Sequence, residues 1–216
     1  MTHNVYVTRR IPQGGLDMLQ RVCGGYEMNP HDRGLTRAEL LLAVKGRDGI
    51  LAMLNDGMDE AVMEAAGPSL KVIANYAVGY NNIDIPAATK RGILVTNTPG
   101  VLTNATADLA WSLLFSVARR IVESDRYFRT GKWDGWGPMQ YLGQDVFGAT
   151  LGVIGAGRIG TAFALRSTGF QMRVLYCHTR SNPELDAIGA RRVELDELLR
   201  ESDFISLHVP LTPATK

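Results

Sequence analysis

A glycine-rich turn limits what this chain can fold into more than any other feature. The turn, Gly155-Ala-Gly-Arg-Ile-Gly160, follows an apolar run at residues 150–154 that is typical of a buried strand. A helical pattern follows over residues 161–168, and a second expected strand spans residues 172–177. A strand, a glycine turn and a helix in this order predict a dinucleotide-binding site at the start of the helix.

Each glycine of the turn has its own predicted role. Gly155 permits the tight turn out of the strand, Gly157 lets the backbone approach a pyrophosphate because it has no Cβ, and Gly160 lets the helix pack closely on the strand. The free N–H groups and the positive dipole end of the helix then face the anion. A βα turn that binds nothing would not explain all three glycines. The expected contact residues are Gly155, Ala156, Gly157, Arg158, Ile159 and Gly160.

The end of the second strand bears on the choice of dinucleotide. NAD-binding domains usually place Asp or Glu there to bind the ribose hydroxyl. This chain has Cys177-His-Thr-Arg-Ser181 at that place, with no carboxylate. Arg180 can pair with a 2′-phosphate, and Thr179 can add a hydroxyl. We therefore expect NADP in preference to NAD, with His178, Thr179 and Arg180 at the adenosine end. The alternative is that Arg180 is a solvated loop cation.

The first hundred residues alternate short apolar runs with helical patterns. The runs are nearly continuous in apolar residues, which is typical of parallel strands buried on both faces. We therefore predict an α/β fold, with a flavodoxin-like parallel-sheet domain over residues 1–100 and a partial Rossmann dinucleotide-binding domain over residues 101–216. The expected strands of the first domain are residues 4–8, 26–29, 48–54, 70–74 and 93–96, and its expected helices begin at Pro12, Thr36, Asp59 and Asp84.

A longer helical pattern and an irregular arm lie between the first domain and the glycine turn. The pattern spans residues 104–129 and predicts one helix, with apolar residues at i, i+4 spacing. The arm, residues 130–148, is rich in glycine and has no periodicity. Trp133 and Trp136 lie in it, and the residues alone suggest that they anchor a surface loop.

Composition excludes several classes of function. The net charge of +1 argues against a surface built to hold nucleic acid. No apolar run approaches the roughly 18 residues of a membrane span. Cys23 and Cys177 form neither a disulfide framework nor a metal-binding pattern, which favours a reducing cytoplasm. We therefore expect no nucleic acid, no membrane and no metal.

Four stretches of the chain form a more specific pattern. They are Asn75-Tyr-Ala-Val-Gly-Tyr-Asn-Asn-Ile-Asp84, Thr96-Asn-Thr-Pro-Gly100 continuing through Ala105-Thr-Ala-Asp-Leu-Ala110, the Gly155–Gly160 turn, and His208-Val-Pro-Leu-Thr212. Together they resemble the D-2-hydroxyacid dehydrogenase family, with the greatest likeness to glyoxylate/hydroxypyruvate reductases. The likeness runs from near the first strand to the last residue.

The resemblance implies a substrate site in the first domain and a cofactor cleft in the second. It implies that the backbone N–H groups of Val78 and Gly79 hold the substrate carboxylate, as adjacent N–H groups of a turn can do. It also implies an arm that packs against a second subunit, and thus a homodimer of the full-length form. The further residues that it places at the site are Met53 and Leu54 in the substrate pocket, Thr106 near the nicotinamide, and Val209 and Pro210 along the cofactor cleft.

The resemblance also implies that the catalytic groups are missing. The family's substrate-binding arginine and its glutamate–histidine pair map onto no residue of this chain. We count three strands from Thr150 onward, so we expect only the first half of the dinucleotide fold and a C-terminally truncated family member. His208 ends a strand at the cleft, but a packed or solvated histidine is the better interpretation than an acid.

These observations lead to one expected function and two rivals. The expected function is the NADPH-dependent reduction of a small 2-oxoacid such as glyoxylate or hydroxypyruvate, with little or no turnover by this chain alone. The first rival is a non-catalytic NAD(P)-binding corepressor-like or interaction protein. The second is an unstable fragment, because half of a parallel sheet leaves an apolar edge strand.

Overall fold

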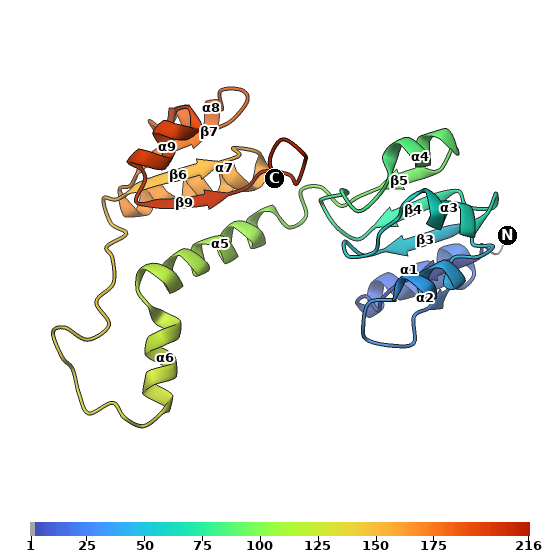
Figure 1. Ribbon diagram of the computed structural model, residues 1–216, viewed down its shortest axis with the longest axis horizontal. Coiled ribbons are helices and arrows are strands. Elements are labelled where there is room, and N and C mark those ends of the chain that lie inside the picture. Colours follow the sequence, from blue (N-terminus) through green and yellow to red (C-terminus); the bar gives the residue numbers. More distant parts are fainter. Residues whose placement is uncertain (1–2) are drawn as a thin grey trace. The chain divides into compact units, whose positions relative to one another are not determined.

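A computed structural model describes residues 3–216 of the chain. It divides the chain into two compact units, Met1–Pro99 and Gly100–Lys216, each with its own sheet (Figure 1). The buried cores are separate as well. One cluster of buried side chains lies entirely in the first unit, and two others lie entirely in the second.

The first unit holds a five-stranded parallel sheet in the order β2-β1-β3-β4-β5. This is the strand order of flavodoxin-like folds, so the predicted fold of this unit is confirmed. Buried side chains concentrate in the central strands because both faces of the sheet are covered. The strands are β1 (Val5–Val7), β2 (Glu27–Met28), β3 (Gly49–Ala52), β4 (Val72–Asn75) and β5 (Leu94–Thr96).

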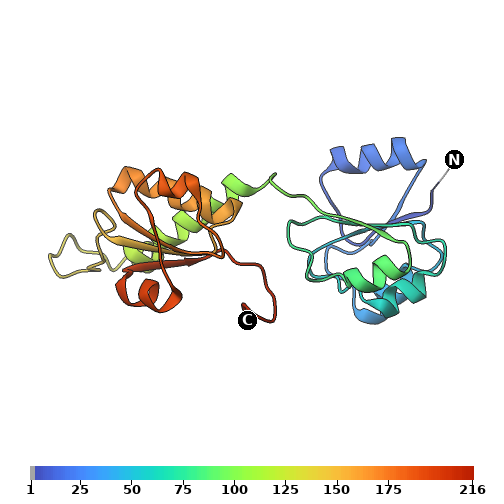
Figure 2. The same ribbon diagram turned by 90° about the horizontal axis from the view of Figure 1, so that it is seen from above.

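Four helices cover this sheet, and Figure 2 shows α1 on one face with the other three on the opposite face. Local sequence fixes where three of them begin. Thr36 and Glu39 form a capping box, and the carboxylates of Asp59 and Asp84 accept N–H bonds at the starts of the next two helices. The helices are α1 (Gln13–Cys23), α2 (Arg37–Ala43), α3 (Glu60–Ala66) and α4 (Ile85–Lys90).

The second unit has a four-stranded parallel sheet in the order β8-β7-β6-β9. The strands are β6 (Thr150–Ile154), β7 (Arg173–Cys177), β8 (Arg191–Arg192) and β9 (Phe204–Leu207). The helices are α5 (Thr103–Ala118), α6 (Ile121–Arg129), α7 (Arg158–Leu165), α8 (Pro183–Asp186) and α9 (Leu195–Glu201), and a 3-10 helix, η1, spans Arg166–Phe170.

The strand count corrects the sequence analysis. The structure adds β8, a two-residue strand in register with Leu175 and Tyr176 of β7, to the three strands that were expected. The strands β6, β7 and β8 therefore form a complete first half of a Rossmann sheet. Strand β9 lies on the other side of β6 (Figure 1), which is the place of the fourth strand in the order 3-2-1-4-5-6. The unit is thus the first half plus one strand, and not the first half only.

The prediction of a single long helix over residues 104–129 is also wrong. The segment forms two helices, α5 and α6, which meet at Arg119 and Arg120. Arg120 has a positive φ of 51°, which an α-helix cannot contain. The N–H of Gln144 donates to the carbonyl oxygen of Ala118 at 2.8 Å, so the returning arm binds the end of α5. Apolar periodicity continues across the break, and it therefore gave no sign of the bend.

Helix α5 packs on α7 through one buried indole. The ring of Trp111 lies 5.2 Å from the ring of Phe163 and 5.3 Å from that of Phe170, and its Nε1–H donates to the carbonyl oxygen of Phe163 at 2.8 Å. This contact satisfies the buried indole N–H and fixes α7 against α5. No helix in the described part of the chain is long and apolar enough to cross a membrane.

Candidate functional site

The glycine turn has the strained, close-packed geometry that its spacing predicts. Gly155 follows β6 with a φ of +96°, a conformation that other residues rarely adopt. A Cβ at this position would lie 2.7 Å from the carbonyl carbon of His208 and 2.9 Å from Cγ1 of Val209. At Gly160 a Cβ would collide with the carbonyl oxygen of Gly155. Glycine is therefore required at both positions for β6, β9 and α7 to approach one another.

Gly157 differs from these two glycines because the space beside it is open. It is the N-cap residue of α7, with an extended backbone and no side-chain cap. A Cβ at Gly157 would meet nothing within 4 Å. The hydrogen bonds formed within residues 3–216 include no acceptor for the N–H groups of Arg158 and Ile159. An open space in front of free N–H groups at a helix start fits a diphosphate.

The turn lies at the point where the strand order of the sheet reverses. Strand β7 is on one side of β6 and β9 is on the other, and the chain reaches them in opposite directions. The N–H of Gly155 donates to Cys177 and that of His208 donates to Ile154, at 2.9 and 2.7 Å, so the three strand ends lie at one edge. Open α/β sheets bind their ligands at the carboxyl ends of the strands at such a point.

Residues 178–181 form a loop at the end of β7, on the β8 side of the turn. Thr179 and Arg180 are exposed, and His178 is half-buried. Arg180 forms no ion pair or side-chain hydrogen bond that the structure describes for residues 3–216. An adenosine ribose bound across the turn would meet this loop, because the loop ends the strand next to β6.

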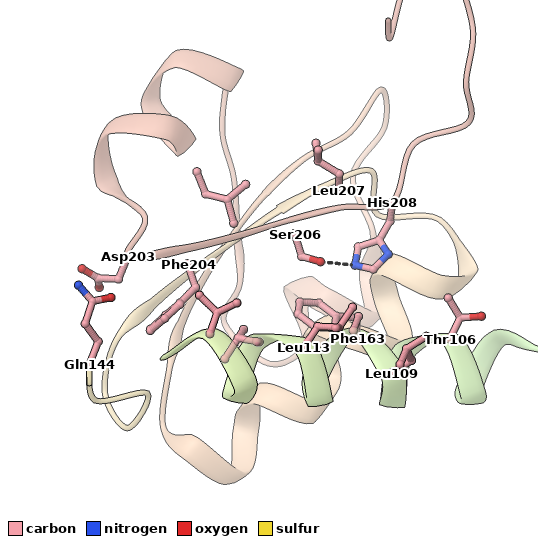
Figure 3. A pocket seen from close by; sticks show the side chains of 14 residues that line it. Thr106, Leu109, Leu113, Gln144, Phe163, Asp203, Phe204, Ser206, Leu207 and His208 are labelled. Carbon is pink, nitrogen blue, oxygen red and sulfur yellow. Dashed lines mark hydrogen bonds between the residues drawn. The ribbon is translucent and has the colours of Figure 1, made fainter. Parts of the chain in front are cut away.

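A cavity of about 580 Å³ opens on the other side, between α5 and β9 (Figure 3). Thr106 and His208 lie together at one end of it, and Leu109, Leu113 and Leu207 line its apolar walls. Thr106 and His208 thus lie in one unit with the glycine turn, although about 50 to 100 residues separate them in sequence. Val209 and Pro210 follow His208 directly, and Val209 touches the turn at Gly155.

His208 has the environment of a packed side chain. Its Nε2 lies 2.9 Å from the Ser206 hydroxyl, and its ring lies 5.0 Å from the ring of Phe163. Burial lowers the pKa of His208 below the ordinary value of 6.5. The imidazole is therefore neutral at pH 7, and no carboxylate within residues 3–216 is paired with it to favour the protonated form. A donor of protons at neutral pH needs the opposite shift.

The four residues expected in the substrate pocket all belong to the first unit. Met53 and Leu54 follow β3, whereas Val78 and Gly79 follow β4, the neighbouring strand. A Cβ at Gly79 would lie 3.8 Å from Cδ1 of Leu54, so the two loops touch. Among the described residues, no acceptor takes the N–H of Val78 or Gly79. Two adjacent free N–H groups in a turn can bind a carboxylate.

Polar side chains that the sequence analysis did not single out join these two loops. Asn82 donates to the carbonyl oxygens of Met53 and Asp56 at 3.2 and 3.0 Å, and Asn75 donates to that of Gly79 at 2.8 Å. Buried Asp56 accepts from the N–H of Met53 at 2.7 Å. Asn75 and Asn82 lie within a stretch that was quoted only for its family likeness. Their spacing alone does not show that both amides turn inward.

Comparisons with known proteins agree with this geometry. The model of a domain family, described as "D-isomer specific 2-hydroxyacid dehydrogenase, NAD binding domain", matches residues 111–216. Glyoxylate reductases from Thermococcus onnurineus and Thermococcus litoralis are 48% and 49% identical over the whole chain. A crystal structure from Polaromonas sp. JS6 66, described as a D-isomer specific 2-hydroxyacid dehydrogenase, is 35% identical, with a TM-score of 0.89 over 100% of this chain and 68% of its own.

The chain spans only part of the length of these relatives. It covers 65% of the Thermococcus onnurineus protein and 66% of the Thermococcus litoralis protein. The second unit is an NAD-binding domain of the Rossmann type, as predicted, and its cofactor is a nicotinamide dinucleotide.

Proposed function

Because the chain belongs to the D-isomer-specific 2-hydroxyacid dehydrogenase family, we propose that it serves the reduction of a small 2-oxoacid, glyoxylate or hydroxypyruvate, with NADPH. The reaction consumes the oxoacid, NADPH and one proton, and it yields the 2-hydroxyacid and NADP. The observation that carries this proposal is the glycine turn: Gly155 and Gly160 let β6, β9 and α7 pack closely, and the open space at Gly157 lies at the start of α7, where a diphosphate would bind. Identity of 48% to a glyoxylate reductase supports the choice of substrate.

The residues of the chain divide the work between two sites. The N–H groups of Val78 and Gly79 hold the substrate carboxylate, beside Met53 and Leu54. Thr106, Val209 and Pro210 line the nicotinamide end of the cofactor site. When bound, the dinucleotide supplies the hydride. The turn formed by Gly155, Ala156, Gly157, Arg158, Ile159 and Gly160 would hold its diphosphate.

The proton donor is not among the groups described at the cavity. His208 is held neutral by burial, and no other histidine lines the cavity. Reduction of a ketone needs both a cation to polarise the carbonyl and an acid to protonate its oxygen. We therefore expect the 216-residue chain to bind its ligands with little or no turnover. Rapid glyoxylate-dependent oxidation of NADPH by the pure chain would contradict this expectation.

The choice of NADPH over NADH rests on the loop at the end of β7. Residues 177–181 contain no carboxylate to bind a ribose 2′-hydroxyl, and Arg180 is exposed without an acidic partner in the described chain. His178 and Thr179 complete this adenosine end. Isothermal titration calorimetry with both nucleotides tests the choice, and a clear preference for NADH would overturn it.

We also propose that the protein forms a homodimer through α6 and the arm. Several apolar side chains are exposed along this segment, whereas an ordinary protein surface exposes them singly. They are Ile121, Val122, Phe128, Trp133, Trp136, Met139 and Leu142. Size-exclusion chromatography with light scattering tests the assembly, and a monomer at micromolar concentration would count against it.

The remaining expectations concern the cell. Free Cys23 and Cys177 fit a reducing cytoplasm, where we place the protein. A net charge of +1 gives no reason to add nucleic acid as a partner. Nothing in the described residues or in the comparisons supports the non-catalytic alternative.

Calorimetric titration of the folded chain tests the proposal as a whole. We expect NADPH to bind with one site per chain, and Gly157→Ala to weaken that binding. Oxalate, a non-reactive dicarboxylate, should shift the amide resonances of Val78 and Gly79 in an NMR titration. A well-folded chain that took up neither nicotinamide nucleotide would overturn the proposed function.

A further inference from the structure

We infer that Arg192 is a positioning residue for the recognition of the 2′-phosphate: it holds the backbone of loop 178–181 so that the Arg180 side chain stands free to pair with the phosphate. This inference rests on the proposed preference for NADPH and assigns a structural cause to it. Arg191 and Arg192 are adjacent exposed arginines in β8, but they have different hydrogen-bond partners.

The guanidinium of Arg192 binds two consecutive backbone carbonyls of the loop. Its Nε–H donates to the carbonyl oxygen of His178 at 2.9 Å, and its Nη2–H donates to that of Thr179 at 3.3 Å. Arg192 lies in β8, opposite Tyr176 of β7, so a paired strand fixes where the guanidinium begins. A planar guanidinium with two bonds fixes the orientation of its acceptors as well as their distance.

The far end of the same loop is tied to the glycine turn. The side-chain amide of Asn182 donates to the carbonyl oxygen of Ala156 at 3.1 Å and to the Thr161 hydroxyl at 2.7 Å. Its backbone N–H donates to the Tyr176 hydroxyl at 3.0 Å. The loop is therefore fixed at both ends, by Arg192 on the strand side and by Asn182 on the diphosphate side. Arg192 and Asn182 together therefore fix the position of the loop, and with it Arg180, relative to the glycine turn.

The charges in this region favour an anion at the loop. The carbonyl oxygens of His178 and Thr179 carry partial negative charge, and the Arg192 guanidinium neutralises it. Arg180 has no acidic partner within the described residues, so its charge is available to a ligand. A phosphate beside the loop would thus meet the free guanidinium of Arg180. The loop carbonyls of His178 and Thr179 already accept hydrogen bonds from the guanidinium of Arg192.

Arg191 provides a matched control on the neighbouring position. It is exposed like Arg192 and lies in the same strand, but it pairs with Glu197 at 2.7 Å and with Glu201 at 3.4 Å. Its charge is compensated by α9, and it forms no hydrogen bond with the loop that the structure describes. Removal of Arg191 therefore changes the net charge by the same amount as removal of Arg192, without touching the loop.

The test compares four variants with the unchanged chain by isothermal titration calorimetry, with NADPH and NADH as the two probes. We expect Arg180→Met to reduce the affinity for NADPH by about thirtyfold and Arg192→Met to reduce it by about tenfold, the order expected for charge-assisted hydrogen bonds. Arg192→Lys should resemble Arg192→Met, because lysine keeps the charge but lacks the planar fork. Arg191→Met should change the affinity by less than about twofold, and all variants should bind NADH as the parent does, within about twofold.

Three outcomes overturn the inference, and they are distinguishable. If Arg180→Met removes the preference for NADPH while Arg192→Met retains it, Arg192 does not position the loop, and the proposed cofactor stands. If Arg192→Met weakens NADPH and NADH equally, its role is general support and not selectivity. If the parent chain shows no preference for NADPH, the proposed cofactor fails and the inference fails with it. Melting temperatures of all variants within a few degrees of the parent show that each difference arises in the folded state.

Discussion

At the scale of the residue, the same amino acid performs opposite tasks within one turn. Gly160 is required by the protein, because its missing Cβ leaves room for the carbonyl oxygen of Gly155. Gly157 is not required by the protein, because the space beside its Cα is open. Its φ of −78° is one that any residue adopts. We therefore propose that the need for glycine at this position comes from the ligand.

This difference leads to a pair of contrasting variants. Gly160→Ala should destabilise the second unit by about 1–3 kcal/mol, because the new methyl group overpacks the β6–α7 contact. Gly157→Ala should leave stability unchanged within about 0.5 kcal/mol and weaken NADPH binding by at least about tenfold, because the methyl group occupies the diphosphate space. Urea unfolding and calorimetric titration measure the two effects. Equal loss of stability in both variants would contradict the assignment.

A second prediction at this scale concerns pH. Burial holds the folded-state pKa of His208 below 6.5, so in acid the unfolded chain binds its proton first. The contribution of His208 to stability is therefore intact above pH 6.5, and it is lost as the pH falls from 6.5 to the lowered folded-state pKa. In the His208→Gln variant, the melting temperature should change less with pH across this window. An unchanged slope in the variant would assign the pH dependence to other groups.

The glycine roles were predictable because they follow from neighbours in sequence. The clamp made by Arg192 was not, because it depends on the register of β8 against β7, and a two-residue strand has no periodicity to reveal it. The inward amides of Asn75 and Asn82 escaped prediction for a similar reason. The carbonyl partners of Asn82, on Met53 and Asp56, lie more than 20 residues away, and Asn75 turns inward to bind Gly79 and Asn82.

At the scale of the element, alternation of strands and helices was sufficient to predict the fold. Parallel strands buried on both faces are apolar throughout, and capping residues such as Thr36 and Asp59 mark helix starts locally. The bend between α5 and α6 was missed because the i, i+4 pattern continues through Arg120. Only the contact of the returning arm with Ala118 shows why the helix ends there.

Strand β9 is an edge strand that carries exposed apolar side chains. Within the described sheet it pairs with β6 alone, and Ile205 and Leu207 are 43% and 69% exposed. An unpaired edge with apolar side chains favours intermolecular strand pairing. Ile205→Lys should therefore reduce aggregation on heating, measured by light scattering, with the melting temperature little changed. As a control, Val22→Lys on α1 replaces an exposed apolar residue away from any strand edge, and it should have no such effect.

At the scale of the whole molecule, the two units have separate cores. Buried side chains from Leu40 to Ile93 form one cluster, and those from Ala107 to Leu198 form the others. All described strands of each sheet belong to a single unit, so each unit has the means to melt independently.

Scanning calorimetry tests this independence. We expect two transitions, and NADPH should raise the temperature of only one. At a hundredfold excess over its Kd, NADPH stabilises the unit that binds it by about 2.7 kcal/mol. A single transition that moves as a whole would show that the units melt together. An NADPH-induced shift that Gly157→Ala removes would assign the responsive transition to the second unit.

The fluorescence of the Trp111 indole can report on α7, because the indole is hydrogen-bonded to that helix. Trp111 is 6% exposed and bonded to the Phe163 carbonyl, whereas Trp133 and Trp136 are 48% and 83% exposed. These are the three tryptophans of the chain. Its emission should therefore lie to the blue of theirs and resist quenching by iodide. With both arm tryptophans changed to phenylalanine, the remaining fluorescence becomes an intrinsic reporter of movement in the helix that begins at the glycine turn.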